Sequence, residues 1–168
     1  VSNQSIKIHD YNRLLDNLND LTEKEFIKKI GENFLIHEKG NQPYYPSQKF
    51  HISMYLGGKF YSLHVKHELR KLQSEKNDLD HILLEDYILK DILGIDNPKT
   101  TDKITYIKGT STIEGINSLK ESVDSGKYKV GFGIYPVSFN DLLKVSDNKI
   151  IMPPKCTYIE PKLVTALV

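Results

Sequence analysis

The sequence predicts an α+β fold in which helices pack on a largely antiparallel sheet within a single compact domain. Three observations support this prediction. The chain has 168 residues, of which 39% are hydrophobic, and this is enough for one core. Runs with strand character and runs with helical periodicity are mixed without the regular alternation of a parallel sheet. Finally, the adjacent Gly57 and Gly58 separate two strand-like runs and predict a tight hairpin.

Six runs have the composition of β-strands, because each combines β-branched and aromatic residues over a short length. The two-residue turn at Gly57 and Gly58 sets the register of the hairpin, so that Leu56 pairs with Lys59 and His51 pairs with His64. The six expected strands are Ile6–Ile8, Phe34–Ile36, Phe50–Leu56, Phe60–Val65, Ile104–Ile107 and Val130–Tyr135.

The two faces of this hairpin differ in polarity. One face carries apolar side chains and belongs in the core: Phe50, Ile52, Met54, Leu56, Tyr61, Leu63 and Val65. The other face is expected to be solvated, or to face a ligand or another domain, and it carries His51, Ser53, Tyr55, Phe60, Ser62 and His64. Aromatic and histidine side chains on an exposed face favour an interface, so His51, Tyr55, Phe60 and His64 are the candidate interface residues.

Four helices are expected. Three begin with a hydroxyl residue followed three positions later by a carboxylate, as a capping box requires. These pairs are Thr22 with Glu25, Ser111 with Glu114, and Ser138 with Asp141. The fourth helix runs from about Asp80 to Leu93, before Gly94, and is apolar over most of its circumference, with Glu85 and Asp86 at its solvent-facing edge.

The end of the chain, Met152 to Leu163, contains three prolines, which hold the backbone extended. A stiff support of this kind suits either a binding loop or a wrap around the domain. Its candidate ligand-binding residues are Lys155, Thr157, Glu160 and Lys162. The single cysteine, Cys156, has no histidine nearby in sequence to act as its base, and a lone cysteine is more often a small apolar filler.

Composition excludes several classes of function. The formal charge is +1, with 23 basic and 22 acidic residues, so nothing predicts nucleic acid or anionic membranes as partners. One cysteine cannot form an internal disulfide, and the polar start VSNQSIK does not resemble a signal peptide. A cytoplasmic protein is the expectation.

Sequence motifs do not identify a catalytic residue or a cofactor. The phosphate-binding, dinucleotide-binding, zinc-protease and serine-hydrolase signatures are absent. Gly131 and Gly133 fall within a strand pattern, where they favour close packing over pyrophosphate binding. His51 and His64 are cross-strand neighbours without a third ligand, so no metal site is predicted. We expect no cofactor in the isolated chain.

Asn12 and Arg13 follow the first expected strand and are two further candidate ligand-binding residues. The guanidinium of Arg13 is planar and suits a carboxylate or phosphate. The alternative is that Asp10 and Asn12 shape a turn while Arg13 pairs with a surface acid.

Four stretches together resemble the C-terminal part of the domain of unknown function 1015 family, whose members are uncharacterised bacterial and archaeal proteins. They are residues 9–26, HDYNRLLDNLNDLTEKEF; 83–98, LLEDYILKDILGIDNP; 123–147, VDSGKYKVGFGIYPVSFNDLLKVSD; and 152–168, MPPKCTYIEPKLVTALV. The positions that match the family pattern are Asp10, Tyr11, Asn12, Arg13, Pro153, Pro154, Lys155, Thr157, Glu160, Pro161 and Lys162. Cys156 stands where the family usually has serine.

Members of this family are much longer than 168 residues, so the resemblance implies that residues 1–168 form the C-terminal portion of a longer protein. Their N-terminal part carries a motif similar to that of the ParB and sulfiredoxin superfamily, several of whose members bind or use nucleotides. The resemblance therefore implies the C-terminal half of a nucleotide-linked enzyme of the phosphoryl-transfer type, inactive without its N-terminal half and acting on a small anionic ligand. The alternative is a non-enzymatic domain that binds a ligand or partner, or has a structural role.

Overall fold

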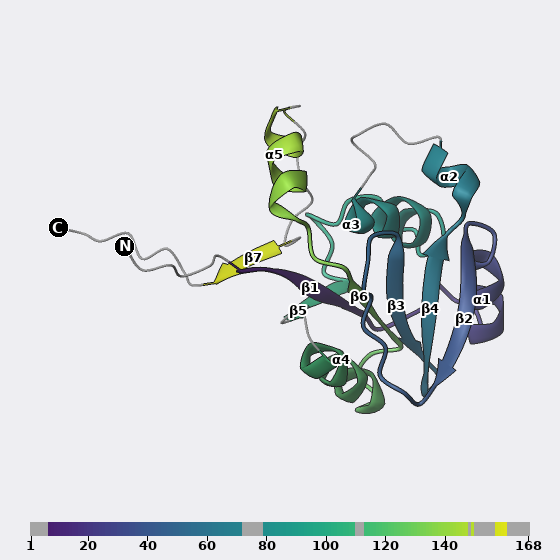
Figure 1. Ribbon diagram of the computed structural model, residues 1–168. Coiled ribbons are helices and arrows are strands. Elements are labelled where there is room, and N and C mark those ends of the chain that lie inside the picture. Colours follow the sequence, from purple (N-terminus) through teal and green to yellow (C-terminus); the bar gives the residue numbers. More distant parts are fainter. Residues whose placement is uncertain (1–6, 72–78, 110–112, 148, 150–156, 161–168) are drawn as a thin grey trace.

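The computed structural model describes residues 7–71, 79–109, 113–147, 149 and 157–160. Within them, seven strands form an antiparallel sheet: β1 (Lys7–Leu15), β2 (Phe34–Gly40), β3 (His51–Leu56), β4 (Lys59–Val65), β5 (Ile104–Lys108), β6 (Val130–Ile134) and β7 (Thr157–Glu160). Their order is β2-β4-β3-β6-β1-β5, and β7 pairs with the N-terminal part of β1 (Figure 1). The predicted α+β fold with a largely antiparallel sheet is confirmed.

Helices cover both faces of this sheet (Figure 1). They are α1 (Glu23–Ile30), α2 (His67–Lys71), α3 (Asp80–Leu84), the π-helix η2 (Glu85–Lys90), α4 (Ile113–Asp124) and α5 (Phe139–Asp147). Apolar residues of α1, α3 and η2 pack on one face in the main core, and α4 packs on the other face in a smaller cluster.

The hairpin of β3 and β4 has the predicted register. Leu56 pairs with Lys59 and His51 pairs with His64. Both turn glycines have positive φ, 58° at Gly57 and 80° at Gly58, as a primed two-residue turn requires. The apolar face of the hairpin lies in the main core, as predicted.

The expectation that the opposite hairpin face is exposed was wrong for most of its length. Ser53 and Ser62 are fully buried, and Tyr55 and Phe60 retain 2% and 0% of their exposure. The two aromatic side chains join the α4 cluster, where Tyr44 and Tyr45 from the preceding segment also pack. The sheet is therefore covered on both faces. The alternation of polar and apolar residues along the hairpin predicted only one covered face.

Strand β1 is longer than predicted and contains Asp10 and Asn12, which the alternative interpretation placed in a turn. Its register runs through Asp10, which pairs with Thr157 of β7, and Asn12, which pairs with Ile107 of β5. Polar side chains on a buried strand hid its extent, because the pattern lacks the apolar content of an ordinary strand.

The predicted helix starts are confirmed at two of the three positions. Thr22 and Glu25 form a reciprocal capping box at the start of α1. The Ser138 hydroxyl accepts from the Asp141 backbone N–H at 3.1 Å and donates to its carboxylate at 2.7 Å. Ser111 lies outside the described residues.

The helix predicted from Asp80 begins there but changes type after Leu84. The next six residues, η2, form a π-helix, which is a rare element that is frequent at functional sites. Gly94 has a φ of 68° and its N–H donates to the Lys90 carbonyl at 3.2 Å, so the expected glycine stop is confirmed.

Candidate functional site

The proline-rich end of the chain falls largely outside the described residues. Lys155 and Lys162 are not among them, and nothing is described of the Glu160 side chain. Thr157 is half-buried in β7, opposite Asp10. The binding role expected for these residues therefore stays a prediction.

Asn12 and Arg13 both lie in β1, and they point to opposite faces of the sheet because strand side chains alternate. Asn12 is fully buried, and its amide nitrogen donates to the Gly115 carbonyl of α4 at 3.0 Å. Asn12 therefore attaches α4 to the sheet. This structural role differs from the ligand contact that we expected for Asn12.

Arg13 is also fully buried. Its Nη1 donates to the Tyr11 carbonyl at 2.7 Å, and its guanidinium lies 5.5 Å from the centre of the Tyr106 ring. The alternative of a surface ion pair for Arg13 was wrong. Burying a guanidinium costs free energy unless other groups compensate for its charge. Arg13 and the groups around it therefore form the candidate functional site.

Arg13 belongs to a group of charged and polar side chains on the α3 side of the sheet, which we call the polar cluster. After burial, its charge is the next largest influence on the pKa of His81 in α3 and of Glu85 in η2, and it acts to lower both, although the pKa of Glu85 is raised overall. Asp141 in α5 also acts on His81. Lys49 pairs with Asp141, and Asp80 precedes His81. The polar cluster thus comprises Arg13, Lys49, Asp80, His81, Glu85 and Asp141.

His81 is fully buried, and neither ring nitrogen has a hydrogen-bond partner among the described residues. Burial, and then the charge of Arg13, lower its pKa to about 3, although Asp141 acts in the opposite direction. The ring is therefore neutral at physiological pH. An unpaired buried polar group costs about 1–3 kcal/mol, so the position calls for an explanation beyond packing.

Glu85 lies at the junction of α3 and the π-helix η2. Its side chain is half-buried, and the Oε1 atom has no hydrogen-bond partner in the described part of the chain. Burial raises its pKa to about 7, against the attraction of Arg13. The expectation that Glu85 sits at the solvent-facing edge of its helix was wrong, whereas Asp86 is exposed as predicted.

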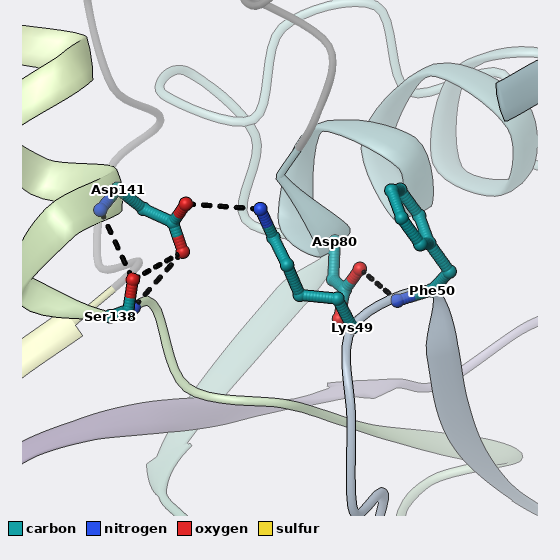
Figure 2. Close-up of polar contacts among 5 residues, drawn as sticks. All are labelled: Lys49, Phe50, Asp80, Ser138 and Asp141. Carbon is teal, nitrogen blue, oxygen red and sulfur yellow. Dashed lines mark hydrogen bonds and ion pairs between the residues drawn. The ribbon is translucent and has the colours of Figure 1, made fainter. Parts of the chain in front are cut away.

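Two contacts join the polar cluster to the segment before β3 (Figure 2). Lys49 Nζ lies 3.0 Å from Asp141 Oδ1, and Asp80 Oδ1 accepts the backbone N–H of Phe50 at 2.7 Å. Burial acts to raise the pKa of Asp141, but hydrogen bonds from Ser138 and Lys49 outweigh it and lower this pKa. Asp141 is therefore a carboxylate that holds both α5 and Lys49 in place.

The four candidate interface residues divide into two pairs. Tyr55 and Phe60 are buried beneath α4, so they do not form an exposed surface. His51 and His64 are half-buried and their rings stack, with centroids 3.8 Å apart. The described residues contain no group of three or more His, Cys, Asp or Glu side chains placed to hold a metal ion.

Sequence reasoning identified Arg13 but missed its companions. Asp80 was predicted only as the start of a helix, and Lys49 and His81 were not among the candidate residues. One signal was available: the first turn of an otherwise apolar helix carries an acid, a histidine and, four residues later, a second acid. Residues four apart share a helix face, so His81 and Glu85 were placed to act together.

Together, the buried sheet, the helices on both faces and the polar cluster define an α+β domain with a partly buried ionisable site. None of the described helices has the length and apolar character needed to span a membrane. The model of the family described as "Protein of unknown function (DUF1015)" matches residues 1–84, which is half of the chain. The chain belongs to this family.

Solved structures with the same fold include two of a mutant free serine kinase. The structure of this mutant in complex with AMP is 12% identical with a TM-score of 0.51, and that of the same mutant in complex with ADP is 14% identical with a TM-score of 0.50. Each comparison covers 94% of this chain and 55% of the kinase chain. This chain thus spans about half the length of the kinase. No curated protein matched it in sequence.

Proposed function

We propose that this chain is one domain of a nucleotide-linked enzyme of the phosphoryl-transfer type, and that it is inactive without the remainder of that enzyme. The main support is the polar cluster, where a buried arginine lies near a neutral histidine that has no hydrogen-bond partner among the described residues, and near a carboxyl group with a pKa of about 7. The fold shared with a kinase bound to AMP or ADP is consistent with this proposal by analogy.

The chemistry of such a reaction suits these groups. The terminal phosphoryl group of a nucleotide passes to a hydroxyl oxygen of the acceptor, the hydroxyl proton passes to a base, and the shortened nucleotide leaves. Enzymes promote this step mainly by positioning the reactants and by stabilising negative charge. Arg13 and Lys49 supply positive charge, and Glu85 is the candidate proton acceptor, because a carboxyl group with a pKa near 7 exchanges protons readily at neutral pH.

Access to the polar cluster is through its less buried members. The Lys49 side chain keeps 30% of its exposure, and Glu85 is half-buried, whereas Arg13 and His81 lie fully inside. An anionic ligand would meet Lys49 first and compete with Asp141 for its ammonium group. Lys155 and Lys162 of the proline-rich end are proposed to add positive charge to the same ligand.

Thermal unfolding with ATP, ADP, AMP or CTP tests the proposal. We expect the full-length protein to melt at a higher temperature with at least one nucleotide, while residues 1–168 show no change. Glu85→Gln and Lys49→Ala in the full-length protein should reduce this rise, whereas Glu114→Gln, at an exposed position of α4, should not. A melting temperature that no nucleotide changes would refute the proposal.

One observation favours the alternative of a partner-binding domain. Phe139 and Leu143, four residues apart on α5, keep 62% and 48% of their exposure. Residues at this spacing lie on one helix face. If Phe139→Ser with Leu143→Ser leaves the chain folded but abolishes its association with the rest of the full-length protein, the partner-binding function is supported for this face.

A further inference from the structure

Three imidazole rings lie side by side across β2, β4 and β3, and we call them the histidine ladder. The rings of His37 and His64 have centroids 4.7 Å apart, and those of His64 and His51 are 3.8 Å apart with an angle of 13° between their planes. His37 is exposed, and the other two are half-buried. The ladder is therefore open to protons from solvent.

Among the described residues, the groups that act on the pKa values of His51 and His64 are basic or neutral. Arg70 of α2 and Lys39 of β2 are the charged neighbours that affect the pKa of His64 in the described part of the molecule. Ser62 Oγ lies 2.6 Å from His64 Nε2, and the Tyr44 hydroxyl lies 3.5 Å from His51 Nδ1. Glu38 of β2 pairs with Lys59 at 2.9 Å and does not contribute to these pKa values.

This environment opposes protonation of His51 and His64. Burial lowers the pKa of His64 to about 4, and the charges of His51, His37, Lys39 and Arg70 act in the same direction. Burial also lowers the pKa of His51, followed by Arg70 and His37. Two stacked imidazolium rings would repel each other, and no carboxylate of the described residues acts on the pKa of either ring to offset that charge. The stacked arrangement therefore belongs to the neutral state.

His51 also attaches the preceding segment to the sheet. The amide nitrogen of Gln48 lies 3.0 Å from His51 Nε2. An amide nitrogen only donates, so Nε2 accepts and the ring carries its proton on Nδ1, facing the Tyr44 hydroxyl. A second proton, on Nε2, turns this atom into a donor, so the present contact with the Gln48 nitrogen is lost and re-forms only if the amide turns to present its oxygen.

The attached segment leads directly into the polar cluster. Lys49 follows Gln48 and pairs with Asp141, and the N–H of Phe50 donates to Asp80 (Figure 2). We propose that the histidine ladder is an acid-sensitive latch, in which neutral imidazoles hold residues 44–50 on β3, while protonation releases the segment and separates Lys49 from Asp141. This regulatory role does not depend on the proposed function.

Nuclear magnetic resonance of the chain between pH 7.5 and pH 4 tests the latch. Imidazole carbon-bound protons report the titration of each histidine, and backbone amides report the position of residues 44–50. We expect these amides to shift with the same midpoint as His51 or His64, while amides of the β1–β5 pair stay unchanged above pH 5. In His37→Gln, which removes an exposed charge that lowers the pKa of His51, the midpoint of His51 should rise, and the midpoint of the amides should rise with it.

A matched control is His67→Gln, because His67 is exposed at the start of α2. This variant should change neither the titration midpoint of His51 nor that of the backbone amides of residues 44–50. Amides of residues 44–50 that do not shift while His51 and His64 titrate would overturn the proposal. So would amides that shift only together with those of β1 and β5, because that result indicates global acid unfolding. The titration of the unmodified chain decides between these outcomes even if His37→Gln does not fold.

Discussion

The Asp80 carboxylate accepts the backbone N–H of Phe50 at 2.7 Å, and Phe50 has a φ of 69° (Figure 2). A bulky residue seldom adopts this left-handed conformation, which costs about 1–3 kcal/mol when the surroundings impose it. The Phe50 carbonyl accepts from Val65 at 3.0 Å, so the residue is held on both sides. Asp80, at the start of α3, thus fixes the backbone where the segment before β3 enters the sheet.

Removing this carboxylate should destabilise the domain. Asp80→Ala leaves the Phe50 N–H without its acceptor, and we expect the free energy of unfolding to fall by about 1–3 kcal/mol. Asp80→Asn keeps an acceptor oxygen and should lose less. Urea unfolding measures both variants, with Asp102→Ala, at an exposed position, as the control. Equal losses for Ala and Asn would contradict this role for the hydrogen bond.

Glu85 should make stability decrease as pH rises. The pKa of Glu85 is about 7 in the folded chain, compared with an ordinary value of 4.5 that applies to the unfolded chain. The unfolded state therefore releases this proton first when pH increases. The loss begins near pH 4.5 and is complete above pH 7. Since part of the side chain is exposed, we expect a contribution of about 1–2 kcal/mol once solvent screening is included.

The variant Glu85→Gln tests this dependence, because glutamine does not ionise. It should be more stable than the unmodified chain at pH 8 and close to it at pH 4.5, as measured by urea unfolding. Glu114→Gln in α4 provides the exposed control and should show no such difference. A Glu85→Gln variant that is less stable at pH 8 would mean that the ionised carboxylate has a partner in the folded state.

His81 should make stability decrease as pH falls, which is the opposite of the effect of Glu85. The pKa of His81 is about 3 in the folded chain, compared with an ordinary value of 6.5 that applies to the unfolded chain. The unfolded state therefore takes up a proton first, and stability falls as pH drops from 6.5 toward 3. His81→Leu replaces the ionisable ring with a side chain that takes up no proton. It also removes two buried nitrogens that have no hydrogen-bond partner among the described residues. We expect the leucine variant to gain about 1 kcal/mol at pH 7, and more at pH 5.

Unfolding in urea at both pH values compares His81→Leu with His67→Leu, which replaces an exposed histidine. A stabilised His81→Leu variant would indicate that the histidine is kept for function at the expense of stability, as is common in binding and catalytic sites. If instead the variant loses stability at pH 7, the ring has a structural role that its contacts do not explain.

The fold was predictable where local chemistry determines it. The glycine turn set the register of β3 and β4, and the capping pairs at Thr22 and Ser138 set two helix starts. The polar cluster was not predictable, because Lys49, His81 and Asp141 are distant in sequence and meet only when the segment before β3, α3 and α5 pack together. Burial of Tyr55 and Phe60 was missed for the same reason, since the covering helix α4 begins about fifty residues later.

Gly131 illustrates a prediction about packing that the structure confirms. It lies in β6 beneath α4, and a Cβ atom there would be 2.7 Å from both Cγ and Cδ2 of Leu119 and 3.1 Å from Leu14 Cδ2. Gly131→Ala should therefore lower the free energy of unfolding by about 1–3 kcal/mol through overpacking. Leu119→Ala should cost about 2–5 kcal/mol by leaving a cavity.

The double variant Gly131→Ala with Leu119→Ala separates overpacking from a backbone effect. If the new methyl group clashes with Leu119, shortening that side chain relieves the clash, and the double variant loses less stability than the sum of the single losses. We expect a coupling of about 1 kcal/mol in a urea-unfolding cycle. Additive losses would show instead that β6 needs glycine for its own backbone, and that the close approach of α4 is not the cause.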